Sequence, residues 1–273
     1  MKLQSLQQIL QVQAQPLYIA LSGGIDSLTL MTVAAKARTA PTIAVHAVSA
    51  AVPPAATERC RGLAKKFGWQ LEEIDAGEFN HEQYVANPVN RCYYCKSSLF
   101  DAILARIEDK AAGQVLIATG TNTDDLGDYR PGLKAAAERQ VWQPYVEAGI
   151  DKNAIRAIAV EAGLGDLSRL PAQPCLSSRI ETGITINVND LRFVHKVESA
   201  LEKLLGPGDI RCRVVSEGVV AQVPDDSGVF TDDKKYQLVE NLVKEICADN
   251  NRQLVRVAPY SMGSAFLHHT QPV

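Results

Sequence analysis

The sequence lacks long apolar runs and clusters of positive charge. No apolar stretch approaches the roughly 18 residues that a membrane-spanning helix needs, and the polar residues spread through 1–15 do not fit a signal peptide. Lysine and arginine number 28 against 31 acidic residues, a net charge of −3, without the basic clusters that follow a phosphate backbone. We therefore expect a cytoplasmic protein that binds neither a membrane nor long nucleic acid.

Cysteine is also scarce, with six in 273 residues. That number is too small for a disulfide scaffold in a chain of this length, so we expect reduced thiols. Cys60, Cys212 and Cys247 are most simply small buried residues. Cys92 and Cys95 form a CxxC at the start of a helical stretch, which favours thiolates and fits a redox pair, half a zinc site or two cluster ligands.

The first part of the chain alternates apolar runs with helical stretches. The runs lie at 17–21, 42–48, 70–75 and 115–119, with a further short candidate at 140–145. This alternation predicts an α/β fold, Rossmann-like, with a parallel sheet and helices on both faces. Asp151 is expected to cap a helix that stops at Gly163.

After about residue 185 the pattern changes. A helix, two alternating strand-like runs, a second helix and a last strand follow one another. That order predicts a small α+β unit in which a sheet packs against helices. We therefore expect a first domain over 1–170 and a C-terminal domain over 171–273.

The hexapeptide SGGIDS, residues 22–27, stands between the first strand and a helix. Glycines let successive N–H groups converge on an oxyanion, and the helix adds its positive end. Ser22 and Ser27 can donate hydroxyl hydrogen bonds, and Asp26 can hold magnesium. The spacing matches neither the Walker loop nor GxGxxG. The alternative is an ordinary glycine turn in which Asp26 and Ser27 cap the helix.

A second polar stretch, residues 119–138, follows the strand at 115–119. Its polar groups are expected at the carboxyl edge of the sheet, beside the glycine turn, where ligands of open α/β sheets bind. Asp124, Asp125 and Asp128 can hold magnesium or serve as turn residues. Arg130 and Lys134 can face phosphate.

SGGIDS resembles the SGGxDS loop of the PP-loop ATP pyrophosphatases. With DYRPGLKA and CLSSR it resembles the LarE family of sulfur transferases, and this resemblance covers nearly the whole chain. It implies ATP-dependent adenylation of a carboxylate of pyridinium-3,5-biscarboxylic acid mononucleotide, after which sulfur displaces AMP to give a thiocarboxylate of the nickel-pincer nucleotide. ATP and magnesium would be bound by these residues: Ser22, Gly23, Gly24, Asp26, Ser27, Asp125, Arg130 and Lys134.

Two sulfur sources occur in that family. One form sacrifices the cysteine of its CLSSR-like motif, and Cys175 occupies that position. The sacrificial form lacks a pair like Cys92 and Cys95, so the sequence resembles the form in which three cysteines hold a [4Fe-4S] cluster and one iron carries sulfide. Arg179 is expected to steady the oxyanion of the acyl transfer. Zinc binding and a redox pair remain alternatives.

Two arginines of the C-terminal part, Arg211 and Arg213, match the family's pair thought to receive the substrate's phosphate. Two solvated charges on an edge strand are the alternative. Glu198 can belong to the same site as these arginines but is more simply a residue of a helix surface, and His46 is expected to be a hydrogen-bonded core residue. The resemblance also implies a homo-oligomer, since similar members form hexamers, with a small-molecule nucleotide and sulfide or a sulfur donor as partners.

Other functions are compatible with the loop alone. They include a PP-loop thiolase acting on tRNA or another small molecule, an ammonia-using ligase, and a non-catalytic nucleotide-binding or sulfur-storage module. The lack of a basic surface argues against tRNA. An ammonia ligase would give no reason for three cysteines.

Overall fold

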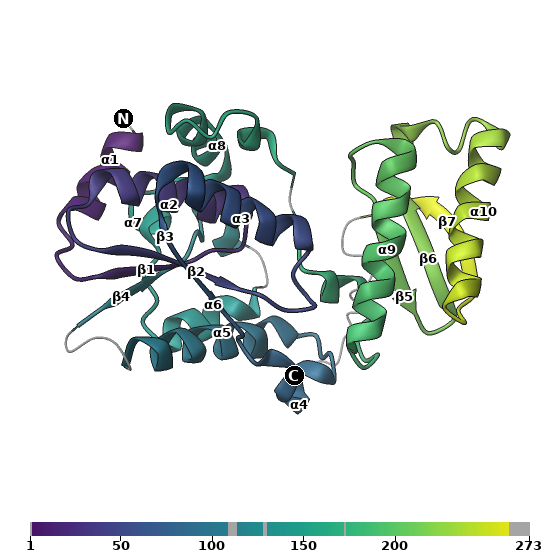
Figure 1. Cartoon of the computed structure of the whole chain (residues 1–273), viewed down its shortest axis with the longest axis horizontal. Coiled ribbons are helices and arrows are strands. Elements are labelled where there is room, and N and C mark those ends of the chain that lie inside the picture. The colour runs from purple at the N-terminus through teal and green to yellow at the C-terminus, as the bar shows by residue number, and fades with distance from the viewer. Residues whose placement is uncertain (1, 109–113, 128–129, 172, 262–273) are drawn as a thin grey trace. The chain divides into compact units, whose positions relative to one another are not determined.

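The computed structural model describes residues 2–108, 114–127, 130–171 and 173–261 (Figure 1). The chain divides into two compact units. One comprises Met1–Asn80 and Cys92–Gln173, and the other comprises His81–Arg91 and Pro174–Val273. Within the described ranges, no helix has the length and apolar character to cross a membrane.

The first unit is an α/β layer structure around a four-stranded parallel sheet in the order β3-β2-β1-β4. Its main elements are α1 (Lys2–Gln11), β1 (Leu17–Ala20), α2 (Ile25–Ala37), β2 (Thr42–Ala47), α3 (Pro54–Phe67), β3 (Gln70–Ile74), α5 (Arg91–Glu108), β4 (Leu116–Ala118), α6 (Pro131–Glu138), α7 (Pro144–Glu147) and α8 (Lys152–Glu161). The predicted α/β class and its four strands are confirmed.

The fifth strand expected at 140–145 is wrong. Trp142 makes a single bridge to Ala118 at the edge of the sheet, and α7 begins two residues later at Pro144. Proline has no N–H group for a strand ladder, but it suits the first turn of a helix.

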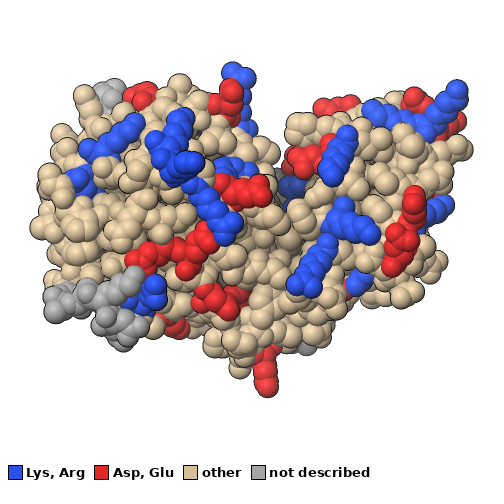
Figure 2. All heavy atoms as spheres, viewed as in Figure 1, with Lys and Arg blue, Asp and Glu red and all other residues tan. Residues whose placement is uncertain are grey.

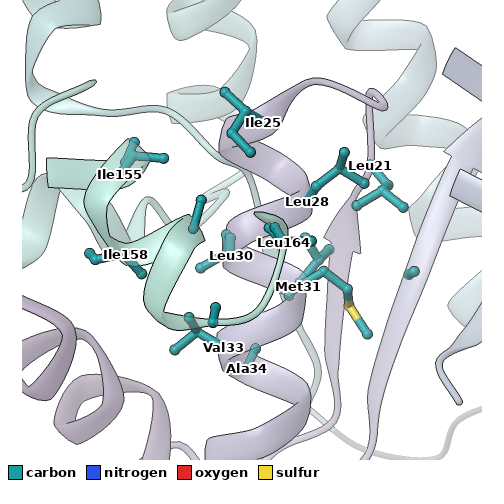
Figure 3. Close-up of a cluster of buried hydrophobic side chains, with 14 of the residues drawn as sticks. Leu21, Ile25, Leu28, Leu30, Met31, Val33, Ala34, Ile155, Ile158 and Leu164 are labelled. Atoms are coloured by element: carbon teal, nitrogen blue, oxygen red, sulfur yellow. The ribbon is translucent and has the colours of Figure 1, made fainter. Parts of the chain in front are cut away.

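Alternate residues of β1 are buried on opposite faces of the sheet. Leu17 and Ile19 pack in a core with α1, α2 and α8, whereas Tyr18 and Ala20 pack with α5 and α6 (Figure 1). Figure 3 shows side chains of α2 and α8 meeting in the first of these cores. Because α2 is buried along most of its length, the turn that precedes it is held firmly against the sheet.

Arg38, just after α2, ties the end of α1 to the sheet. Its buried guanidinium donates to the carbonyls of Leu10 (2.9 Å), Gln13 (3.0 Å) and Gln15 (2.5 Å), and Nε donates to Thr42 Oγ1 (3.1 Å). Arg38→Met would leave these acceptors without their donor. We expect it to lower the free energy of unfolding by about 3 kcal/mol, measured by urea denaturation.

The matched control for this prediction is Arg106→Met. Arg106 is half exposed, and its Nε donates to Glu72 Oε2 at 3.3 Å. Ion pairs with an exposed partner contribute about 1 kcal/mol or less. Equal losses of stability in the two variants would contradict the role given to Arg38.

The second unit is the expected small α+β structure. Its main elements are α4 (Glu82–Val85), α9 (Val188–Leu205), β5 (Arg211–Val215), β6 (Gly218–Val223), α10 (Asp233–Asp249) and β7 (Leu254–Pro259). Strands β5 and β6 form an antiparallel hairpin, and β7 pairs with β6 in parallel. A helix, a hairpin, a helix and a strand therefore follow one another as predicted.

Residues 81–91 join this second unit, although they lie far from it in the sequence. Tyr84 Oη and Ser177 Oγ are 2.7 Å apart, and Asn87 Nδ2 donates to the carbonyls of Glu181 (2.8 Å) and Ile184 (3.1 Å). Arg91 donates to the carbonyl of Ser177 at 3.0 Å. These contacts fix the segment that carries Cys175.

Candidate functional site

The turn between β1 and α2 is built around Gly23. Its φ of +77° is in the left-handed region, and a Cβ there would lie 2.8 Å from both Cβ and O of Ala56 in α3. Any side chain would therefore strain the backbone and collide with α3. The geometry explains why the turn requires glycine at this position.

The two serines of SGGIDS bind each other and the turn. Ser27 Oγ accepts from the N–H of Ser22 (3.1 Å) and donates to the carbonyl of Gly24 (3.1 Å), while Ser22 Oγ accepts from the N–H of Gly24 (3.2 Å). The serines thus hold the shape of the turn. An anion bound here would compete with their hydroxyl groups for the same N–H groups.

Asp26 follows the turn and is paired with Lys152, the first residue of α8. Lys152 Nζ lies 2.5 and 2.6 Å from the two carboxylate oxygens. Burial raises the pKa of Asp26, and the hydrogen bond and charge of Lys152 oppose that rise. Lys152 was not among the predicted site residues. Its sequence signal is its place beside the correctly predicted N-cap Asp151, which accepts from the N–H of Ala154 at 2.7 Å.

The stretch after β4 lies against the same turn. A Cβ on Gly120 would be 2.8 Å from the backbone nitrogen of Ser27, so the two backbones are in direct contact. Asp124 accepts from the N–H of Lys152 at 3.1 Å. The expectation that these two segments meet at the carboxyl edge of the sheet is confirmed, and it follows from parallel pairing of β1 with β4.

The other predicted phosphate and magnesium residues have varied surroundings. Asp125 accepts from the N–H of Asn122 (3.0 Å) and pairs with Arg130 (2.8 Å). Lys134 is exposed, 3.9 Å from Glu138 and over the ring of Tyr93. Their contacts with a ligand stay predictions. Asp128 lies outside the described residues.

Cys92 and Cys95 lie on the first turn of α5, three residues apart and half buried, so they share one face of the helix. Cys175 belongs to the second unit. Within each unit, the described residues include no group of three His, Cys, Asp or Glu side chains placed to hold a metal ion. Because the proposed ligands come from both units, the three-cysteine set stays a prediction.

All six cysteines are described, and none is in a disulfide. Cys60, Cys212 and Cys247 are buried, as predicted. Burial raises the pKa of Cys60 to about 12, which keeps it a neutral thiol.

Arg179 holds the backbone around Cys175. Its guanidinium donates to the carbonyls of Pro174 (2.9 Å) and Cys175 (3.3 Å), and Nε pairs with Glu198 Oε1 at 2.9 Å. The expectation that Glu198 lies on a helix surface is wrong. Its side chain is only 15% exposed and also accepts from the N–H of Cys212 (2.9 Å), because this face of α9 packs on β5.

Arg211 and Arg213 are both buried in β5, so the alternative of two solvated edge charges is wrong. Arg213 donates to Gln222 Oε1 and to the carbonyl of Ser178, each at 2.9 Å. Burial and the like charges of Arg179 and Arg211 lower the pKa of Arg213 to about 10. Because the positive charges of Arg179, Arg211 and Arg213 repel one another, an anionic ligand bound beside them would be stabilised.

His46 is a hydrogen-bonded core residue, as predicted. Its Nδ1 lies 2.7 Å from the carbonyl of Leu21, which can only accept, so Nδ1 carries the proton. Nε2 then accepts from Thr57 Oγ1 at 2.9 Å. The ring thus supports the residue that precedes Ser22, and burial lowers the pKa of His46.

The lowered pKa of His46 predicts a pH dependence. The folded protein favours the neutral ring, so the unfolded chain takes up the proton first, and stability is lost as pH falls below about 6.5. We expect His46→Gln to flatten the stability profile between about pH 7 and pH 5, measured by urea denaturation. The control is His195→Gln, at a partly buried residue of α9, and this variant should keep the stability profile of the unaltered protein. If the unaltered protein and both variants lost stability equally as the pH falls, His46 would not be the source of the pH dependence.

The sequence matches no family model. An uncharacterised protein of Synechocystis sp. is 38% identical over 205 residues, 75% of this chain and 74% of that protein. An uncharacterised protein of Methanocaldococcus jannaschii is 30% identical over 217 residues, 80% of this chain and 81% of that protein. Pyridinium-3,5-bisthiocarboxylic acid mononucleotide synthase of Lactiplantibacillus plantarum is 28% identical over 231 residues, 82% of each chain.

The fold and the turn define a Rossmann-like α/β protein with a glycine loop at a helix N-terminus, joined to a small α+β unit. The chain belongs to one family with the Synechocystis and M. jannaschii proteins. The similarity to the L. plantarum synthase supports the resemblance of this chain to LarE.

Proposed function

We propose that this protein is an ATP-dependent sulfur transferase acting on pyridinium-3,5-biscarboxylic acid mononucleotide. The observation that carries the proposal is the similarity to the L. plantarum synthase, which spans 231 residues, more than either unit contains. The arrangement at Asp26 and the buried arginines of β5 support two separate tasks, activation and binding of an anionic substrate.

The substrate carboxylate would be activated by ATP at the turn between β1 and α2 in the first unit. The substrate carboxylate attacks the α-phosphorus of ATP, the bond to the β-phosphate oxygen breaks, and pyrophosphate leaves. Ser22, Gly23, Gly24 and Ser27 would bind the phosphates at the N-terminus of α2. Magnesium, for which the Asp26 carboxylate is a suitable oxygen ligand, would supply positive charge to the leaving pyrophosphate. Lys152 orients that carboxylate.

The sulfur-transfer step would use Cys92, Cys95 and Cys175. A sulfur nucleophile attacks the acyl carbon of the adenylate, and AMP leaves with the original carboxylate oxygen. Thiols fit an iron–sulfur cluster, and Cys92 and Cys95 stand at a helix N-terminus that favours thiolates. A [4Fe-4S] cluster on Cys92, Cys95 and Cys175 would supply the sulfur. Arg179 would keep the Cys175 backbone in place, and Arg211 and Arg213 would bind the phosphate of the substrate.

The surface supports a small-molecule substrate. On the face drawn in Figure 2, basic side chains lie among acidic ones over both units. We also propose a cytoplasmic homo-oligomer, with sulfide or a sulfur donor as the second substrate.

The test is an oxygen-free assay with ATP, magnesium, sulfide and the biscarboxylate nucleotide. We expect AMP, pyrophosphate and a product in which sulfur replaces one carboxylate oxygen, detected by mass spectrometry. Pyrophosphate release should require the biscarboxylate. Pyrophosphate release that does not depend on the biscarboxylate nucleotide would contradict the proposal, and so would thiolation of tRNA instead of this nucleotide.

A further inference from the structure

Arg59 of α3 lies against the phosphate turn, although it belongs to none of the motifs. Its Nη1 donates to the carbonyl of Gly23 at 2.5 Å. One turn earlier on α3, Ala56 closes the space beside Gly23. The helix is therefore packed directly on the turn, and the guanidinium of Arg59 is fixed at its rim.

The charge of Arg59 has no acidic partner among the described residues. The Arg59 side chain is partly buried beside the turn, and this burial lowers the pKa of Arg59. Arg61, on the same helix, differs in both respects. It is 56% exposed and binds both carboxylate oxygens of Glu73, at 2.6 and 2.7 Å.

A partly buried cation without an acidic partner is costly unless an anion approaches it. Arginine carries five N–H donors in a rigid fork, and within the described chain Arg59 uses only Nη1 in a hydrogen bond. The remaining donors suit two oxygens of a phosphate group. The negative charge of Asp26 is held by Lys152, so it does not neutralise Arg59.

We propose that Arg59 binds the β- and γ-phosphates of ATP, and hence the pyrophosphate product, at the turn 21–24. The inference rests on the proposed ATP-dependent function and names a binding residue that its motifs leave out. The hydrogen bond to Gly23 orients the guanidinium, and the N-terminus of α2, which begins at Ile25, adds positive charge at the turn.

The test compares binding of magnesium pyrophosphate and of AMP by isothermal titration calorimetry. In Arg59→Met we expect pyrophosphate affinity to fall about ten- to fifty-fold, with AMP affinity within about two-fold of the original protein. Arg61→Met is the matched control on the same helix, and its affinity for both ligands should stay unchanged, because Arg61 binds Glu73.

Arg59→Lys keeps the positive charge but lacks the fork, so we expect a loss of about three- to five-fold for pyrophosphate alone. If Arg59→Met does not fold, Arg59→Lys tests by itself whether Arg59 binds the phosphates. Unchanged pyrophosphate affinity, or equal losses for pyrophosphate and AMP, would overturn the proposal and leave Arg59 a support of the turn. If the unaltered protein binds neither magnesium pyrophosphate nor AMP, the ATP-dependent function itself fails.

Discussion

Alanine at Cys92, Cys95 or Cys175 is expected to remove the iron from protein purified without oxygen and to abolish thiocarboxylate formation. A [4Fe-4S] cluster with one open iron needs all three thiolates, so each substitution leaves it with too few ligands. The measurement is iron and acid-labile sulfide per chain, for which we expect about four irons in the unaltered protein. Pyrophosphate release should persist in the variants, because activation uses other residues.

The matched control is Cys247→Ala, at a cysteine buried in α10. It should keep its iron and its product. Zinc in place of iron, or no metal, would contradict the cluster mechanism. Conversion of Cys175 to dehydroalanine during turnover, visible by mass spectrometry, would then identify it as a sacrificial sulfur donor, and the pair Cys92 and Cys95 would need another role.

Asp26→Asn is expected to lower carboxylate-dependent pyrophosphate release by about 10²- to 10³-fold. The amide keeps the shape of the side chain but removes the negative charge that would bind magnesium and that holds Lys152. The measurement is the rate of ATP–pyrophosphate exchange as a function of magnesium concentration. The variant should need more magnesium for half its maximal rate.

The control for this variant is Asp151→Asn, next to Lys152. Asparagine caps a helix about as well as aspartate, so α8 and the position of Lys152 should be retained. We expect its exchange rate to stay within about two-fold of that of the unaltered protein. If Asp26→Asn also kept an exchange rate within about two-fold of that of the unaltered protein, the Asp26 carboxylate would take no part in activation.

The sequence by itself determined the layers of the first unit and the place of its loop. Apolar runs at 17–21 and 42–48 have no polar alternation, because both faces of the sheet are covered, and this pattern is local. The N-cap Asp151 was predicted because its hydrogen bond to Ala154 is local, and the core residue His46 was predicted because it lies within an apolar run. The stretch after β4 was expected at the carboxyl edge of a parallel sheet, and the pairing of β1 with β4 places it beside the turn.

Only the tertiary structure decided which charges meet. Lys152 reaches Asp26 across 126 positions of sequence, and Arg59 reaches Gly23 across 36. Glu198 was expected on a helix surface because its spacing does not show which face of α9 packs on β5. The site of this protein therefore depends on contacts between distant elements, because the partner of a buried charge is set by how helices pack and not by its neighbours along the chain.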